Sequence, residues 1–328
     1  MKVIMISTDR LLFKTGSQTQ RRLVQSESKF ETLTVIVFAK KSLHYQTTKL
    51  TPMITVVPTN SSFAFNYIRD AILLGKLVSA VDFVTTQDPF ETGLVGRALA
   101  RHYQAKLELQ IHTDFLSPYF VKRSFLNWLR VLIAGRLLPQ ADYVRVVSER
   151  IEQSLKAKSW QLKAIVEVRP VAIDLEELKQ APITVDLHQK YPQFREIILM
   201  VSRLEPEKRI DLAIKSLAKF LPAVKNVGLA IVGSGSEEMR LKHLVDELGL
   251  GDYVKFEGWQ ENLATYYKTA DLFLVTSSYE GYGLTIVEAK ACGLPVVSTD
   301  VGIAREAGAI IVEGQPDVIA DKIIQIIS

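Results

Sequence analysis

The chain has 328 residues, 48% of them apolar and 23% charged, a composition that excludes disordered and collagen-like proteins. Its length corresponds to about two domains of ordinary size. The single cysteine, Cys292, excludes an internal disulfide and a cysteine-rich metal site, and favours a reducing, cytoplasmic compartment. We expect no signal peptide and no membrane span, because no apolar run approaches the ~20 residues that a span requires.

Charge is distributed unevenly along the chain. Residues 1–175 hold 24 Lys and Arg against 14 Asp and Glu, whereas residues 176–328 hold 16 against 22. One interpretation is that the surface charges are unevenly distributed without any role in binding. The other is that the first half faces an anionic partner, such as a membrane surface, a lipid phosphate or an acidic glycan. The basic residues are scattered and no nucleic-acid-binding motif is present, so nucleic acid is not an expected partner.

Apolar runs of strand length alternate with stretches of helical periodicity over the first half of the chain. This alternation predicts an α/β domain with a mostly parallel sheet. The predicted strands cover residues 2–7, 34–39, 54–57, 83–86, 106–111, 143–147 and 165–168, and the clearest helical stretches cover residues 64–80 and 92–103.

The stretch 119–138 is apolar at most positions. On a helical wheel it carries one narrow stripe that is mostly polar. The stripe consists of Arg123, Asn127, Arg130 and Ala134. Two interpretations stay open. The segment is either a buried helix whose stripe forms its wet edge, or an interfacial helix that inserts Phe and Trp side chains into lipid. The basic first half adds weight to the second.

A second α/β cycle includes a polar stretch, residues 174–195, which contains Pro182 and Pro192 and which we interpret as a linker and the entry to the second domain. Strands are predicted over residues 197–202, 227–232, 254–257, 272–276, 295–299 and 309–312, and helices over residues 210–221, 236–248, 262–268, 284–291 and 317–327. We therefore expect two Rossmann-like domains, residues 1–175 and 176–328, with ligands bound beyond the carboxyl ends of their strands.

The most informative segment follows the predicted strand 272–276. It contains Glu280, Gly281, Tyr282, Gly283, Leu284, Thr285 and Glu288. Two glycines in a tight turn allow close approach of a ligand, and the N–H groups of the helix that starts there favour a diphosphate. The two carboxylates suit hydroxyl groups. The combination fits a nucleotide sugar, and the structural alternative is a glycine-rich turn with two unrelated glutamates.

Two cations flank another predicted turn. Arg203 ends a strand and Lys208 precedes the helix predicted at residues 210–221, so both side chains can reach one diphosphate. Taken alone, two cations at this spacing usually lie on the solvated surface and bind no ligand. Together with the acidic segment they favour a phosphate site.

These segments resemble the motifs of the retaining glycosyltransferases of family four, the glycosyl transferases group 1. Residues 279–288 resemble the E-x7-E motif, and residues 201–209 resemble G-R-L-x-x-E-K-G with the first and last glycines replaced. The strand and glycine-rich turn at Gly233 also match, as does a V-x-F-x-G segment that ends at Gly258 and precedes Trp259. The resemblance is dense over residues 197–306 and looser over residues 1–175.

The resemblance implies a GT-B fold, in which two Rossmann-like parallel-sheet domains face each other across a cleft. It implies an acceptor-side N-terminal domain and a donor domain at the C-terminus. The implied reaction moves a hexosyl unit from a nucleotide-diphosphate sugar to a glycan or lipid-linked acceptor, with retention and without a metal or other cofactor. The chain contains no Asp-x-Asp motif, which agrees with a metal-free site.

The family also implies roles for individual residues. Arg203 and Lys208 would neutralise the charge that develops on the leaving diphosphate. Glu280 would hold hydroxyl groups of the donor sugar, and Glu288 would hold the ribose. The segments at Gly233, Gly258 and Trp259 would line the donor site.

Two features of the first half extend the resemblance. His112 precedes Thr113 and Asp114 after a predicted strand and resembles the family's H-x-D, whose histidine contacts the donor sugar or the acceptor. Gly16 lies where relatives often carry Gly-Gly beside the diphosphate, although Ser17 replaces the second glycine.

The sequence departs from the family in two further places. The turn at residues 169–174 lacks the usual Asn and Gly, which predicts an altered geometry. Relatives continue beyond the helix predicted at residues 317–327, which implies a missing clamp or a shortened chain. The alternative function is therefore a non-catalytic nucleotide-sugar-binding subunit of a transferase complex. A dinucleotide-dependent oxidoreductase is disfavoured, because no G-x-G-x-x-G follows the first strand.

Overall fold

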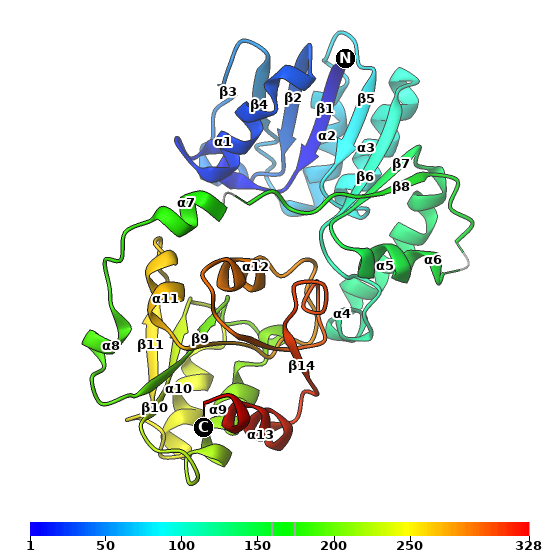
Figure 1. Cartoon of the computed structure of the whole chain (residues 1–328). Helices are drawn as coiled ribbons and strands as arrows, with labels where there is room; N and C mark the ends of the chain where they lie inside the picture. The colour runs from blue at the N-terminus through cyan, green and yellow to red at the C-terminus, as the bar shows by residue number, and fades with distance from the viewer. Residues whose placement is uncertain (159, 174, 328) are drawn as a thin grey trace. The chain divides into compact units, whose positions relative to one another are not determined.

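The computed structural model describes residues 1–158, 160–173 and 175–327 of the protein. The chain divides into two compact units, Met1–Pro170 and Val171–Ser328, each an α/β layer structure with its own sheet (Figure 1). Asp174 and Ser328, at the altered turn and at the end of the chain, lie outside the described residues.

The first unit is built on an eight-stranded sheet with the order β3-β4-β2-β1-β5-β6-β7-β8, in which only the β3–β4 pair is antiparallel. Its strands are β1 (Lys2–Ser7), β2 (Thr32–Val37), β3 (Thr48–Lys49), β4 (Ile54–Pro58), β5 (Phe83–Thr86), β6 (Lys106–Ile111), β7 (Tyr143–Val146) and β8 (Ile165–Val168). Its helices are α1 (Gln18–Gln25), α2 (Tyr67–Gly75), α3 (Glu91–Tyr103), α4 (Pro118–Arg123), α5 (Phe125–Leu137) and α6 (Glu149–Lys156).

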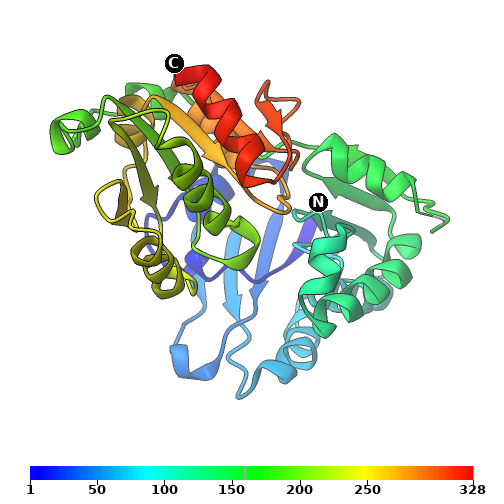
Figure 2. The same ribbon diagram turned by 90° about the horizontal axis from the view of Figure 1, so that it is seen from below.

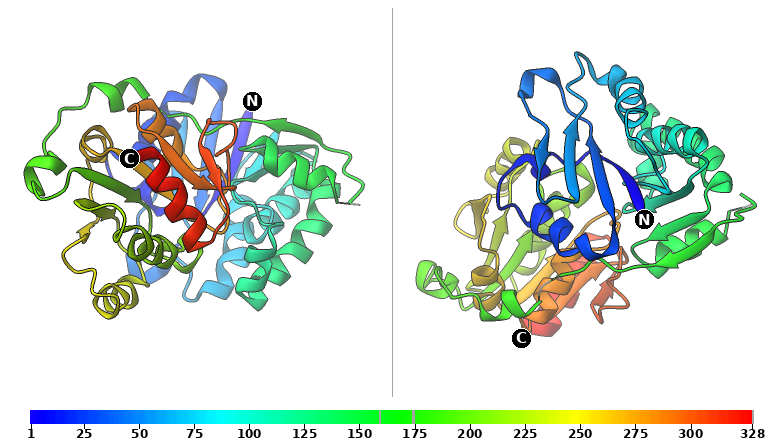
Figure 3. Two further views of the ribbon diagram at one scale, coloured as in Figure 1. Left: turned by 60° about the horizontal axis from the view of Figure 1, so that its bottom comes forward. Right: turned by 90° about the horizontal axis from the view of Figure 1, so that it is seen from above.

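Helices cover both faces of this sheet. Leu23 of α1 packs with Val3, Leu33 and Val35 on one face, whereas α2 and α3 pack together on the other side of the strands (Figure 3, right). Several of these helices begin at a serine whose hydroxyl accepts a hydrogen bond from an N–H of the first turn, such as Ser148 at the start of α6.

The second unit is built on a six-stranded parallel sheet with the order β11-β10-β9-β12-β13-β14. Its strands are β9 (Glu196–Val201), β10 (Val227–Val232), β11 (Val254–Gly258), β12 (Leu272–Val275), β13 (Val296–Thr299) and β14 (Ile310–Val312). Its helices are α7 (Leu175–Gln180), α8 (Leu187–Lys190), α9 (Ile210–Phe220), α10 (Glu238–Glu247), α11 (Ala264–Thr269), α12 (Leu284–Ala291) and α13 (Pro316–Ile327).

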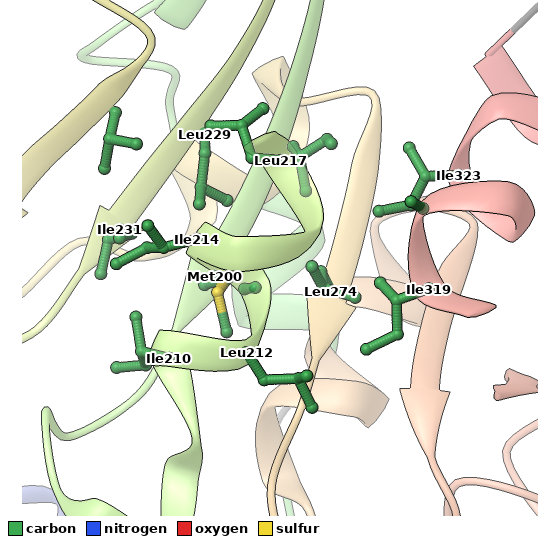
Figure 4. Close-up of a cluster of buried hydrophobic side chains, with 14 of the residues drawn as sticks. Met200, Ile210, Leu212, Ile214, Leu217, Leu229, Ile231, Leu274, Ile319 and Ile323 are labelled. Carbon is green, nitrogen blue, oxygen red and sulfur yellow. The ribbon is translucent and has the colours of Figure 1, made fainter. Parts of the chain in front are cut away.

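The last helix is part of the core of this unit. Helix α13, drawn in red, lies beside α9 (Figure 2 and Figure 3, left). Ile319 and Ile323 point from α13 toward Leu274 of β12, within one cluster of buried apolar side chains (Figure 4). This burial agrees with the almost continuous apolar sequences of β10 and β12, which are typical of parallel strands covered on both faces.

Most strands lie within two residues of their predicted bounds, but several short elements were not predicted. The stretch interpreted as a linker and domain entry contains α7 and α8. These short helices are held by tertiary contacts, including hydrogen bonds from the Thr184 and Val185 N–H groups to Thr265 Oγ1 at 3.1 and 2.8 Å. Helices α1 and α6 and the short strand β3 were not predicted.

The structure decides against the first of the two interpretations of the 119–138 segment, in which the stripe forms a wet edge. This edge faces inward along α5, because Asn127 and Ala134 are buried and Arg130 pairs with Glu91 of α3 at 2.9 Å.

Candidate active site

The candidate site lies at the carboxyl ends of β9 and β12 in the second unit. These strands are neighbours in space, and the strand order reverses between them. Ligands of open parallel sheets bind beyond the strand ends at such a switch point. The loops that leave β9 and β12 carry Lys208 and Glu280, respectively.

Lys208 and Glu280 form a largely buried ion pair. Lys208 Nζ donates a hydrogen bond to Glu280 Oε1, and the two side chains are only 14% and 18% exposed. Ser277 Oγ donates to the same oxygen at 2.7 Å. An ammonium group has three donors, so Lys208 can hold Glu280 and still donate to an anion.

The two loops are fastened to each other by hydrogen bonds. Thr276 Oγ1 donates to the carbonyl oxygens of Lys208 and Arg209 at 2.9 and 2.8 Å. The Ser278 N–H donates to the Glu207 carbonyl at 2.7 Å. These bonds fix the relative positions of Lys208 and Glu280, so the site is organised before a ligand binds.

The turn before α12 is packed against the segment that follows β13. Gly302 has a φ of +51°, and a Cβ at this position would lie 2.3 Å from the Tyr282 carbonyl oxygen. That oxygen accepts a hydrogen bond from the Ile303 N–H at 2.9 Å. Glycine at 302 is therefore required by both backbone conformation and space.

The start of α12 has the features of an anion site. The cap residue Gly283 has a φ of +96°, and the first turn, beginning with Leu284 and Thr285, contains no acidic residue. Thr285 lines a small hollow together with Lys208 and Glu280. The helix start is thus adjacent to the ion pair, and its N–H groups and dipole favour negative charge there. Gly281 lies in the same turn, between Glu280 and Tyr282.

Arg203 occupies a separate ion pair. Its side chain is 72% exposed, and one guanidinium nitrogen lies 3.2 Å from Oε1 of the buried Glu207. The structure therefore brings Lys208 and Glu280 together, with Ser277, to which the sequence assigned no role, as a third member. Arg203 lies on the same loop as Lys208 but pairs with Glu207.

Glu288 lies in the middle of α12 and is bonded to the core. The hydroxyl of Tyr267, a fully buried side chain, donates to Glu288 Oε2 at 2.9 Å. Burial, followed by the adjacent Glu288 carboxylate, raises the pKa of Tyr267 well above its usual value, so this phenol remains a donor. Sequence reasoning missed this contact, because Tyr267 has the pattern of an ordinary core aromatic.

Gly233 joins three strand ends. Its φ is +135°, a Cβ there would lie 1.9 Å from the Ser202 carbonyl oxygen, and its N–H donates to the Gly258 carbonyl at 2.7 Å. Gly258 has a φ of +69°, and the Trp259 side chain is exposed. The exits of β9, β10 and β11 are therefore held in one arrangement.

The buried carboxylate of Glu257 holds the end of β11 in place. Glu257 accepts hydrogen bonds from Lys190 Nζ at 2.6 Å, from Tyr266 at 3.0 Å and from Tyr191. Burial opposes ionisation of Glu257, but these hydrogen bonds outweigh it, and the pKa of Glu257 lies below its usual value.

His112 and Gly16 belong to the first unit. His112 follows β6, and its Nε2 lies 3.0 Å from Gln110 Oε1. Crowding by protein atoms, followed by the Arg145 charge, lowers the pKa of His112 to about 4. His112 is therefore neutral at physiological pH, with one ring nitrogen able to accept a hydrogen bond. The Gly16 N–H donates to Gln20 Oε1 at 3.0 Å just before α1.

The loop after β1 lines a pocket of about 470 Å³ in the first unit. Arg10, Lys14, Phe13 and Tyr45 contribute to its walls, and the two rings stack with centroids 4.4 Å apart. The pocket therefore combines cations with an aromatic surface.

Clusters of metal-ligating side chains are absent from the described part of the chain. Residues 1–158, 160–173 and 175–327 contain no group of three or more His, Cys, Asp or Glu side chains placed to hold a metal ion.

The chain is similar to known glycosyltransferases. Residues 187–328 match the family model described as glycosyl transferases group 1. Alpha-monoglucosyldiacylglycerol synthase of Streptococcus pneumoniae is 27% identical over 248 residues, which are 72% of this chain and 55% of that protein. The matches cover about half the length of the first curated relatives.

Solved structures share the fold over nearly the whole chain. Sucrose-phosphate synthase of Thermosynechococcus elongatus has a TM-score of 0.81 at 22% identity and covers 99% of this chain and 90% of its own. HepE of Anabaena in complex with UDP-glucose has a TM-score of 0.73 at 22% identity and covers 99% of this chain and 89% of its own. These structures have the GT-B fold that the sequence predicted. Residues 187–328 of the second unit therefore resemble the glycosyl transferases group 1 family.

Proposed function

We propose that this chain is a retaining, metal-independent glycosyltransferase that moves a hexosyl unit from a nucleotide-diphosphate sugar to a glycan or lipid-linked acceptor. The observation that carries the proposal is the buried Lys208–Glu280 pair beside the start of α12, in a unit that matches a glycosyltransferase family. Cation, carboxylate and helix start are the groups that a diphosphate joined to a sugar requires.

In this mechanism the bond between the anomeric carbon and the diphosphate oxygen breaks, and a bond to the acceptor oxygen forms on the same face. Negative charge grows on the leaving diphosphate. Lys208 and the N–H groups of α12 stabilise that charge, and Arg203 contributes after turning from Glu207 toward the phosphates. The leaving phosphate takes the acceptor proton. Glu280, fixed by Lys208 and Ser277, orients the hydroxyl groups of the sugar.

Two relatives guide the choice of substrates. HepE was solved with UDP-glucose, so UDP-hexoses are the first donors to test. The pneumococcal relative is named for the synthesis of a glucosylated diacylglycerol, which supports a lipid-linked acceptor of the cell envelope. We further propose that His112 and the Arg10–Lys14 pocket serve the acceptor side of the reaction, and that the enzyme works in the cytoplasm, where a free Cys292 stays reduced.

The test is turnover by the purified chain. Incubation with a panel of UDP- and GDP-hexoses should release nucleoside diphosphate by hydrolysis or transfer with at least one donor. Lys208→Ala and Glu280→Gln should abolish this release. Lys219→Ala, which removes an exposed ion pair to Asp317 in the same unit, should leave it unchanged. Equal turnover by the Lys208 variant and the wild type would contradict the site assignment.

Three further measurements refine the proposal. The anomeric configuration of the product, determined by NMR, should equal that of the donor, and EDTA should leave the rate unchanged. Binding of a nucleotide sugar without release of product under any acceptor would favour the alternative, a non-catalytic donor-binding subunit.

A further inference from the structure

Helices α4 and α5 expose the side chains that a helix of a globular protein normally buries. The inner side of α5 carries Asn127, whose Nδ2 donates to the Phe120 carbonyl at 2.9 Å, and Arg130, which pairs with Glu91. The outer side carries Phe125 and Trp128, which are 73% and 44% exposed. On α5, the polar Asn127 and Arg130 side chains therefore face the protein, and the aromatic Phe125 and Trp128 side chains face outward.

Helices α4 and α5 expose five large apolar side chains, which we call the α4–α5 face: Tyr119, Phe125, Leu126, Trp128 and Leu132. The rings of Phe125 and Trp128 stack with centroids 5.4 Å apart. Several exposed apolar side chains on neighbouring helices are typical of a site of contact with a protein or a membrane.

The charges on this segment are all of one sign. Lys122, Arg123 and Arg136 are exposed beside the α4–α5 face, and residues 118–137 contain no Asp or Glu. Aromatic side chains at the centre with cations at the margin are typical of helices that lie in the interface of an anionic bilayer.

We propose that the α4–α5 face docks on an anionic lipid bilayer, with Phe125, Leu126 and Trp128 entering the headgroup boundary and Lys122, Arg123 and Arg136 contacting lipid phosphates. A second copy of the chain fits less well. In a two-fold dimer the same surface is used by both partners, so these cations would meet each other with no carboxylate from the segment between them.

The docking is interfacial rather than spanning. Within the described residues, no helix has the length and apolar character needed to cross a bilayer. Helix α5 covers only Phe125–Leu137, and its inner side is occupied by contacts to α3. The proposal goes beyond the glycosyltransferase assignment, because docking requires neither donor nor turnover.

Vesicle sedimentation with the full chain tests the proposal. Vesicles of phosphatidylcholine with phosphatidylglycerol should pellet the protein, vesicles of phosphatidylcholine alone should pellet much less, and added salt should weaken the binding. Replacing two aromatic anchors, as in Phe125→Ser with Trp128→Ser, should lower the partition coefficient at least ~10-fold. Lys122→Gln with Arg136→Gln should lower it on the anionic vesicles only.

A matched control is available just after α2. Leu77 is 81% exposed and follows Lys76 in the same unit, so Leu77→Ser removes a comparable apolar group outside the α4–α5 face. This variant should bind vesicles as the wild type does. Because the substituted side chains are exposed, all variants should keep the melting temperature of the wild type, which separates lost docking from misfolding.

Two results would overturn the proposal. One is wild-type protein that stays in the supernatant with anionic vesicles. The other is equal binding by the double serine variant and the wild type. Concentration-dependent dimerisation that the serine variant abolishes, without vesicle binding, would assign the face to a second copy instead. None of these outcomes depends on turnover, so they leave the proposed reaction to its own test.

Discussion

Gly302→Ala tests the packing that holds the donor-site turn. Gly302 has a φ of +51°, and a methyl group there would lie 2.3 Å from the Tyr282 carbonyl oxygen and 2.8 Å from its carbon. Left-handed backbone costs an alanine about 1–2 kcal/mol, and overpacking a site that must shift costs about 1–3 kcal/mol. We therefore expect the free energy of unfolding of the second unit to fall by about 2–5 kcal/mol.

The assay is thermal unfolding, followed with nucleotide-sugar turnover on the same samples. A loss of this size corresponds to a melting temperature lower by about 4–20 °C for a unit of this length. Turnover at a temperature where the variant is folded should also fall, because the displaced Tyr282 carbonyl belongs to the turn that precedes α12.

Gly308→Ala is the matched control. Its φ is +69°, but no atom lies within 4 Å of the position that the added methyl group would take, so it carries the backbone cost without the clash. It should lose only the backbone cost of about 1–2 kcal/mol and keep its turnover. Equal loss of stability and activity in the two variants would refute the reasoning that close contact with Tyr282, rather than backbone conformation alone, makes Gly302 necessary.

Three further predictions concern the second unit. Tyr267→Phe removes the donor to Glu288 and should lower the free energy of unfolding by about 1–3 kcal/mol, measured by urea denaturation; no change would contradict a structural role for this bond. Because the pKa of Glu257 is lowered on folding, its ionised form stabilises the folded state above its ordinary pKa, and this contribution is lost as the pH falls through the folded-state pKa. Glu257→Gln should therefore flatten the loss of stability below about pH 5, and parallel pH profiles would contradict this. Ile323→Ala should cost about 2–5 kcal/mol, more than the same change at half-buried Ile324, and equal losses would show that α13 is not anchored through Ile323.

The strands of both units could be predicted because their burial is visible in the sequence. All six residues of β10 are buried, and such continuous apolar runs occur only where helices cover both faces of a parallel sheet. Helices α7 and α8 could not be predicted in this way. They are short, and their stability depends on distant partners such as Thr265, whose contribution no local pattern records.

The orientation of α5 shows a second limit. A helical wheel finds the stripe that contains Asn127 and Arg130, but it does not reveal which side of the helix meets the protein. The deciding contact is the ion pair with Glu91, 39 residues away in the chain. A polar stripe can therefore face the protein interior when an oppositely charged side chain from a distant part of the sequence lies there.

The parts of the candidate site that consist of residues close together in the sequence could be predicted. The turn at 280–283 and the helix start at Leu284 lie where the spacing placed them. The pairing of Lys208 with Glu280 joins loops 72 residues apart, and it depends on β9 and β12 being neighbours in the sheet. Ser277 was passed over because its role arises only when its hydroxyl meets Glu280 Oε1.

The central claim is that Lys208, Glu280 and the start of α12 form a diphosphate site, and calorimetric titration with UDP and UMP tests it most directly. The wild type should bind UDP more tightly than UMP. Lys208→Ala should weaken UDP binding by a factor of about 10–100, the value of one hydrogen bond to a charged group, and should leave UMP binding nearly unchanged. An unaltered UDP affinity in the folded Lys208 variant would contradict the account.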